Sequence, residues 1–336
     1  MAYQNLGTPR FWVSTLQFLA YMGKASVGSG STGKITTGID EDILSLLYIN
    51  PSEQLTITPT SDNYQSTDFI QYEFAEPLTN YMPKDQNFQM FLGHDLIGFT
   101  TNIRALGAGS DYTALANTEL VNYGAPIERS GFSIAIGNNA DDMGTNTLSI
   151  ASFGNNEASY NVGQEYHLGS FLYGNYYDMP HSPDLNVTIG YEMDGVKKVK
   201  TKAGIDLVDH QYIRPLRWGD RAAWSIDNID HELARVGRRF WDISFTMIEN
   251  SDIFSEFSNV YHEEDYVYTN LLRGNTFYNQ VIHKTCGGIL PFVFQPDSNN
   301  NNPDQFSICK LDMDSLKLKQ SANGVYNFSV RVKEVW

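Results

Sequence analysis

Residues 316–336 read LKLKQSANGVYNFSVRVKEVW, and this stretch decides the fold class. Apolar residues recur at every second position, at Tyr326, Phe328, Val330 and Val332, with polar residues between them. A period of two is that of a strand with one buried face. The pair Asn323-Gly324 tolerates the positive φ angles that tight hairpins require. The stretch therefore predicts a β-hairpin that buries one face.

The same alternation continues upstream. Trp241, Ile243, Phe245 and Met247 alternate with polar residues, as the residues of a half-buried strand do. Other short apolar runs are separated by turn residues, at 55–57, 69–74, 88–92, 132–136, 148–153, 185–193, 289–294, 306–311 and 316–318. Helix is expected only in short pieces, over 42–47, 231–236 and 263–273. The sequence predicts an all-β protein with few short helices.

The length of 336 residues predicts more than one domain, since a domain has about 100–200 residues. Residues 1–38 are predicted to form an N-terminal arm and a Gly/Ser-rich linker, because an apolar run, Phe11–Met22, precedes a Gly, Ser and Thr-rich stretch. The regular spacing of strands predicts a β-sandwich over 39–185 and a second β domain over 186–336 that ends in the hairpin.

Composition indicates a folded chain and excludes one class of partner. Apolar residues make up 41% and aromatic residues 13%, which favours strands over disorder. The net charge of -16 argues against a grip on nucleic-acid phosphates, which needs clustered Lys and Arg. The Lys-rich stretch 197–202 alternates as the exposed strand of a hairpin does, which favours a solvated edge, with a binding patch as the alternative. With no long apolar segment and no basic-then-apolar start, we expect no membrane insertion and synthesis in a cytoplasm.

No motif for catalysis is complete. Residues 28–34 match the glycine and lysine positions of a P-loop, but the following residue lacks the hydroxyl that would bind magnesium, which favours a flexible linker. His231 and His262 each precede a glutamate, but neither has the second histidine of a zinc protease. Cys286 and Cys309 are expected to be free, buried thiols. The sequence predicts no catalytic, metal or cofactor-binding residue, and no enzyme.

Several phrases spread along the chain resemble those of virion structural proteins of tailed phages, particularly a group common in marine phages. The phrases start at Gly7 (GTPRF), Phe91 (FLGHDL), Tyr177 (YDMPHSPDLN), Arg239 (RFWDISF), Gly287 (GGILPFVFQPD) and Val330 (VRVKEVW). The resemblance implies a virion protein made in the host cytoplasm, with the tail tip or baseplate as the preferred station, either distal-tail-like or adaptor-like. Leu92–Leu96 also resembles a framework phrase of discoidin-like, galactose-binding sandwiches.

The first functional hypothesis is ring-like self-assembly with docking to other phage tail proteins. Aromatic side chains supply large contact areas with few rotatable bonds, which suits interfaces. We expect Phe11, Trp12 and Phe18 in the arm to serve assembly, with a role in the core as the alternative.

The second hypothesis is a carbohydrate-binding module of a tail fibre that recognises a host surface glycan. Tyr173, Asn175, Tyr176 and Tyr177 are its candidate glycan platform, with packing between domains as the alternative. The oxygen-rich segment 296–302 is interpreted as a solvated turn, with a calcium site as the alternative. A cell-wall hydrolase would need a carboxylate pair that the sequence does not offer.

Overall fold

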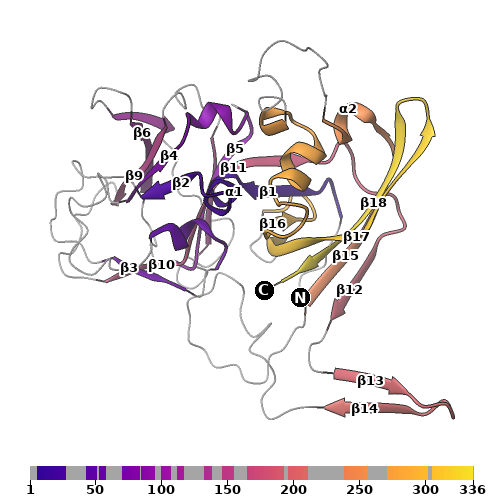
Figure 1. Ribbon diagram of the computed structural model, residues 1–336. Coiled ribbons are helices and arrows are strands. Elements are labelled where there is room, and N and C mark those ends of the chain that lie inside the picture. The colour runs from indigo at the N-terminus through magenta and orange to yellow at the C-terminus, as the bar shows by residue number, and fades with distance from the viewer. Residues whose placement is uncertain are drawn as a thin grey trace.

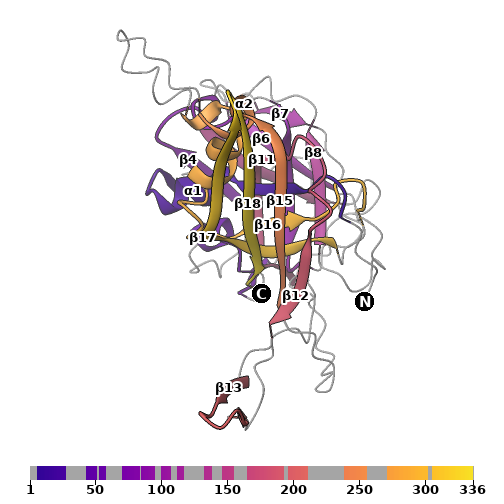
Figure 2. The ribbon, with the colours of Figure 1, turned by 90° about the vertical axis from the view of Figure 1, so that its right-hand side faces the viewer.

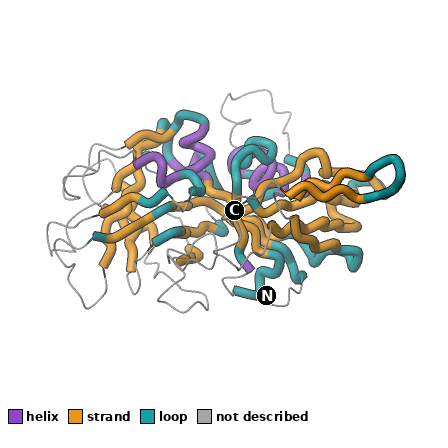
Figure 3. The backbone as a smooth tube through the Cα atoms, turned by 90° about the horizontal axis from the view of Figure 1, so that it is seen from below, coloured by secondary structure: helices purple, strands orange, loops and turns teal. Residues whose placement is uncertain are grey.

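The computed structural model describes residues 6–27, 43–50, 53–57, 70–83, 85–94, 100–106, 112–116, 132–137, 146–154, 165–192, 196–210, 238–255, 271–301 and 305–335. Strands predominate and the helical segments are short, so the predicted all-β class is confirmed. The helical segments are α1 (Thr15–Tyr21), η2 (Ile43–Leu47), η3 (Leu78–Asn80), α2 (Asn250–Ile253), the π-helix η4 (Tyr278–His283) and the short stretch 271–273. Most of them lie along one side of the molecule (Figure 3).

The largest element is an antiparallel sheet of nine strands. In spatial order its strands are β12 (Thr188–Glu192), β15 (Arg238–Glu249), β18 (Val325–Glu334), β17 (Ser307–Ala322), β16 (Phe292–Gln295), β1 (Arg10–Ser14), β11 (Ser170–Asp178), β5 (Asn87–Leu92) and β8 (Phe132–Gly137). Strands from all three predicted segments pair in this one sheet. The sheet is therefore continuous across both predicted boundaries.

A second antiparallel sheet has five strands: β2 (Ala25–Val27), β4 (Ile70–Phe74), β9 (Thr147–Gly154), β6 (Thr100–Leu106) and β7 (Tyr112–Ala116). Two further pairs are separate, β3 (Leu55–Ile57) with β10 (Tyr166–Leu168) and β13 (Val196–Lys200) with β14 (Asp206–His210). Figure 1 shows the five-stranded sheet on the left and the β12–β15–β18–β17 end of the large sheet on the right. The molecule therefore has two lobes joined by the middle strands of the large sheet.

The core has three apolar clusters, placed by the alternation along the strands. One fills the space between the five-stranded sheet and β5 and β11, under α1, with Tyr72 and Phe171 among its members. The second lies between η4 and the strands β1, β15, β16, β17 and β18, and includes Trp241 and Phe277. The third covers the opposite face of the middle strands, around Trp12. The middle strands are thus buried on both faces.

The predicted arm is not an arm in this structure. Residues 10–14 form β1, which pairs with β11 on one side and with β16 on the other. Phe11, Trp12 and Val13 are all buried, and α1 follows directly, with the Ser14 side chain accepting from the Gln17 backbone N–H at 3.2 Å. A strand that is buried on both faces is a continuous apolar run in the sequence. Such a run shows that the segment is covered, but not whether its own chain or another molecule covers it. Here the partner is the chain's own sheet.

The C-terminal hairpin is confirmed. β17 and β18 pair up to the turn, where Gly324 has a φ of +72°, and Phe328, Val330 and Val332 are buried. The expectation for Met247 is wrong, since its side chain is 76% exposed. The register between β15 and β18 shifts between Phe245 and Ile248, and Met247 has a φ of +61°. This β-bulge turns Met247 outward, and Ile248 takes the buried position.

The expected helix over 42–47 corresponds to η2. The one expected over 231–236 lies outside the described residues, and of 263–273 only 271–273 are described, as helix. Cys286 and Cys309 are both free thiols as expected, but Cys286 is only half-buried.

Replacing the most central aromatic residue tests the position of β1. We expect Phe11→Ala to lower the free energy of unfolding by about 3–5 kcal/mol, because it leaves a cavity among buried rings. Met247→Ala removes an exposed side chain and should change it by less than about 0.5 kcal/mol. Chemical denaturation followed by circular dichroism measures both. If Phe11→Ala leaves the free energy of unfolding unchanged, Phe11 is not a core residue, and residues 10–14 form an external arm instead.

Candidate interaction surface

The three residues predicted for assembly lie inside the folded chain. The ring of Phe11 contacts Phe277 edge-on, with centroids 5.4 Å apart. The indole N–H of Trp12 donates to Gln295 Oε1 at 3.1 Å, and Phe18 is buried beside His283. The structure therefore gives these side chains the alternative role, that of core residues. They are not accessible to a second molecule while the sheet is intact.

The candidate glycan platform is also largely buried. Tyr173, Asn175 and Tyr177 lie on one face of β11 and are buried, whereas Tyr176 on the other face is half-buried. Burial raises the pKa of the Tyr173 and Tyr177 hydroxyls. The side-chain amide of Asn175 donates to the carbonyl oxygens of residues 83 and 85 and to Asn87 Oδ1. A platform needs ring faces open to solvent, so these four residues do not form one in this structure.

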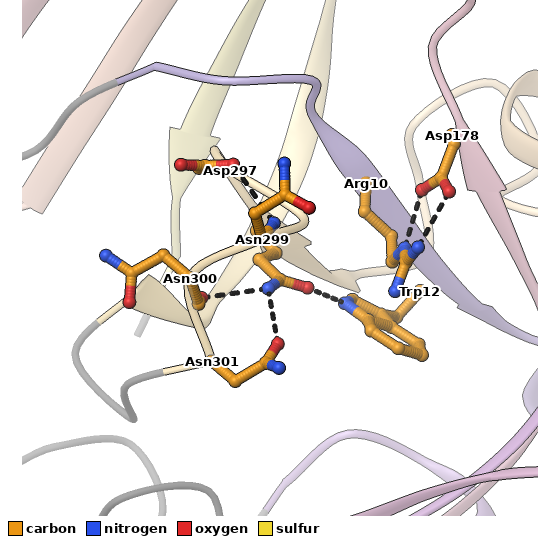
Figure 4. A network of polar contacts seen from close by, with 8 residues as sticks. Arg10, Trp12, Asp178, Asp297, Asn299, Asn300 and Asn301 are labelled. Carbon is orange, nitrogen blue, oxygen red and sulfur yellow. Dashed lines mark hydrogen bonds and ion pairs between the residues drawn. The ribbon is translucent and has the colours of Figure 1, made fainter.

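A polar network fixes β1 to its neighbours (Figure 4). Arg10 and Asp178 are register partners on β1 and β11, and they form a bidentate ion pair with N–O distances of 2.5 and 2.7 Å. The guanidinium also lies over the Tyr176 ring, 4.2 Å from its centroid. Planar stacking and two parallel hydrogen bonds together hold the side chain in one orientation. The Arg10–Asp178 pair therefore helps to fix the register of β1 against β11.

The oxygen-rich loop is tied into the same network. Gln295, which accepts from Trp12, donates to Asn300 O at 2.9 Å and to Asn301 Oδ1 at 3.1 Å. Asp297 Oδ1 accepts from the backbone N–H of Asn299 at 3.0 Å. These contacts anchor the turn on the core, while the side chains of Asn299 and Asn301 are exposed, as expected of a solvated turn. The calcium alternative for 296–302 stays untested.

A lysine is buried in the core next to α1. Lys284 Nζ donates to Gln280 Oε1 at 2.8 Å and to Thr15 Oγ1 at 3.2 Å, and both partners are neutral. Burial lowers the pKa of Lys284 to about 7, because the charged form loses its hydration. Burial also lowers the pKa of the neighbouring His283. The ammonium group is therefore a cost to folding at neutral pH.

The remaining sequence motifs fall outside the part of the chain that the structure describes. The P-loop-like residues 28–34, His231 and His262 lie outside the described residues. In the part of the chain that is described, no three His, Cys, Asp or Glu side chains are grouped so that they could hold a metal ion. None of the described helices is long and apolar enough to span a membrane.

One end of the nine-stranded sheet is open. β12 is the last strand, and no described strand pairs with its outer side. Ile189 and Tyr191 are register partners of Trp241 and Arg239, so they lie on the face of the sheet that carries the core, yet they are 37% and 44% exposed. Leu185, just before the strand, is fully exposed. We call Leu185, Ile189 and Tyr191 the edge strip.

Within its described residues, β12 lacks the two residue types that usually protect a free edge. Natural sheets blunt such edges with Lys, Pro or a covering loop. β12 reads TIGYE and has neither residue. Asp184 and Glu192 lie at the two ends of the strip. It is therefore an apolar edge, flanked by carboxylates, on which a further segment could pair or pack.

The β13–β14 hairpin, residues 196–210, stands apart from both large sheets (Figures 1 and 2). Val199 and Leu207 are opposite each other in register, and Val199, Ile205 and Leu207 are 49%, 62% and 56% exposed. The turn is nonetheless regular: the Thr201 N–H donates to Ile205 O at 2.9 Å, and Gly204 has a φ of +83°. The hairpin thus presents an apolar row at its tip, which we call the hairpin row.

Sequence reasoning found the segments of these surfaces but not their roles. The run 185–193 was predicted as a strand, and 197–202 as an exposed hairpin strand, and both segments do form strands. Nothing in the local pattern says that β12 ends the sheet, because its position depends on the pairing of distant strands. The local pattern that pointed to an exposed surface was the alternation of apolar residues with lysines in residues 196–202.

The burial of Lys284 predicts a specific pH dependence of stability. Between pH 7 and 10.5 the unfolded chain binds a proton that the folded chain does not, so the free energy of unfolding should rise with pH. The rise is up to about 1.4 kcal/mol per pH unit for one proton. Lys284→Met removes this contribution. Chemical denaturation at pH 7.5 and 9 should show a smaller rise in the free energy of unfolding for the variant than for the unaltered protein. Equal rises in both proteins would contradict the prediction.

Comparison with protein-family models, with curated proteins and with solved structures found no match for this chain. What the chain does has therefore to be inferred from its own residues and their geometry.

Proposed function

We propose that the chain is a non-enzymatic structural subunit that assembles with further copies of itself. The observation that carries the proposal is the open end of the nine-stranded sheet at β12. There the face of the sheet that carries the core ends on β12 in two half-exposed apolar side chains, Ile189 and Tyr191. Exposed apolar surface along the edge of a sheet is a usual starting point for strand addition or packing between subunits.

We place this subunit in a phage virion, with the tail tip or baseplate as its station and other tail proteins as further partners. This part of the proposal rests on the sequence phrases that resemble phage virion proteins. Three of those phrases meet at β1. The phrases from Gly7 and Tyr177 are joined by the Arg10–Asp178 pair and the bond from the Met179 N–H to Pro9 O, and the phrase from Gly287 contains β16, which pairs with β1. Proteins that share this framework would share these sequence phrases even if they bind no common ligand. The carbohydrate-binding alternative loses its predicted platform, since three of its four residues are buried.

Light scattering on the purified full chain tests self-assembly. The expected mass is a discrete multiple of the 37.9 kDa subunit, stable over a range of protein concentrations, because closed symmetric assemblies have fixed copy numbers. A mass of one subunit at every concentration would contradict the proposal.

The virion station has its own test. Peptides of the chain should appear in purified particles of a phage whose genome encodes it, in a fixed ratio to other tail proteins. Purified particles without such peptides would remove the virion station and leave self-assembly standing.

A further inference from the structure

We infer that the β13–β14 hairpin of one copy docks on the edge strip of a second copy. The inference rests on the proposed self-assembly and names the two surfaces that would perform it. It goes beyond the open edge itself, because it assigns a function to a hairpin that pairs with no other described strand.

The first argument is the stability of the hairpin. An isolated two-stranded hairpin is marginally stable in water, because it has no second layer on which to bury its side chains. This hairpin has three large apolar residues near its tip, and all of them are exposed. A surface that covers the hairpin row would remove that exposure and hold the two strands in register. The described part of the same chain does not supply such a surface.

The second argument is charge. Residues 196–210 contain four of the 23 Lys and Arg of the chain but only two of its 39 Asp and Glu, so the hairpin is net positive on a chain of charge -16. A second copy of this acidic chain is therefore an electrostatically favourable partner. Nucleic acid would match the lysines but leave the hairpin row exposed to water.

The third argument is the match between the two surfaces. The hairpin row is flanked by the exposed Lys200 and Lys202, whereas the edge strip ends in Asp184 and Glu192. Beside the hairpin row, these two lysines outnumber the one exposed carboxylate, Asp206, which is the register partner of Lys200. Carboxylates predominate at the ends of the edge strip, where Glu192 lies 3.9 Å from Lys333. The predominant charges of the two surfaces are therefore opposite. Both surfaces are on every copy, so docking can repeat from copy to copy into a ring or close reciprocally in a dimer.

The decisive variant is Val199→Ser with Leu207→Ser in the full chain. We expect the dissociation constant of the assembly to rise at least about 10-fold, because a central apolar contact is lost. The matched control is Met247→Ser with Ile289→Ser, which removes two exposed apolar side chains outside the hairpin and the edge strip. The control should keep the mass of the unaltered protein. Circular dichroism spectra and melting temperatures show that all variants are folded.

A charge exchange identifies the receiving surface. Lys200→Glu with Lys202→Glu should weaken assembly, and so should Glu192→Lys. The three substitutions together should restore assembly toward that of the unaltered chain. Restoration supports docking on the edge strip, whereas additive weakening overturns that placement.

The outcomes separate this inference from the proposed function. If the unaltered chain forms a discrete oligomer that persists in the Val199→Ser/Leu207→Ser variant, the hairpin inference is wrong and self-assembly stands. If the unaltered chain is a monomer, both are wrong. If only the hairpin variants dissociate and the control does not, the inference is supported.

Discussion

The structure depends on the burial of β1 on both faces and along both edges. Phe11 and Val13 pack in one cluster and Trp12 in the cluster on the opposite face, while β11 and β16 take up the backbone hydrogen bonds. A glycine makes this approach possible: a Cβ at Gly174 would lie 2.2 Å from Val13 O. Because β1 joins the two lobes, residues near the N-terminus determine whether strands hundreds of residues apart can share one sheet.

Polar contacts also hold neighbouring strands of the large sheet together. Arg239 pairs with Glu334, with an N–O distance of 2.9 Å, and donates to Ser307, which ties β15 and β18 to β17. Burial lowers the pKa of the Arg239 guanidinium while the bond to Glu334 raises it, and the balance leaves the pKa raised. Like Arg10–Asp178, the Arg239–Glu334 pair is partly buried and bidentate. Two parallel hydrogen bonds fix the orientation of both side chains, so such a pair contributes to the register of the strands as well as to stability. The phrases that stand out in the sequence therefore mark contacts within the framework.

The proposed assembly follows from the surfaces that the described part of this framework leaves exposed. An open antiparallel sheet always has two edge strands, and a protein must protect them or use them. Here β12 ends in an apolar strip between carboxylates, and the next residues along the chain form a net positive hairpin with an apolar tip. Edge and hairpin are thus neighbours in sequence but offer complementary chemistry to another copy. Electrostatic matching would set the register, and apolar burial would supply most of the affinity.

The sequence by itself determined the all-β class, the C-terminal hairpin and most strand positions, because period-two alternation and the Asn-Gly turn are local properties of the backbone. It also determined the charge contrast between residues 196–210 and the rest of the chain. It misjudged Met247, where a β-bulge reverses the alternation. For the tyrosines of β11 it left packing and glycan binding open, and Tyr173 and Tyr177 are buried. Only the tertiary structure decided that residues 10–14 lie at the centre of a sheet and that β12 lies at its end, because strand order comes from pairing between residues far apart in the chain, which no local pattern records.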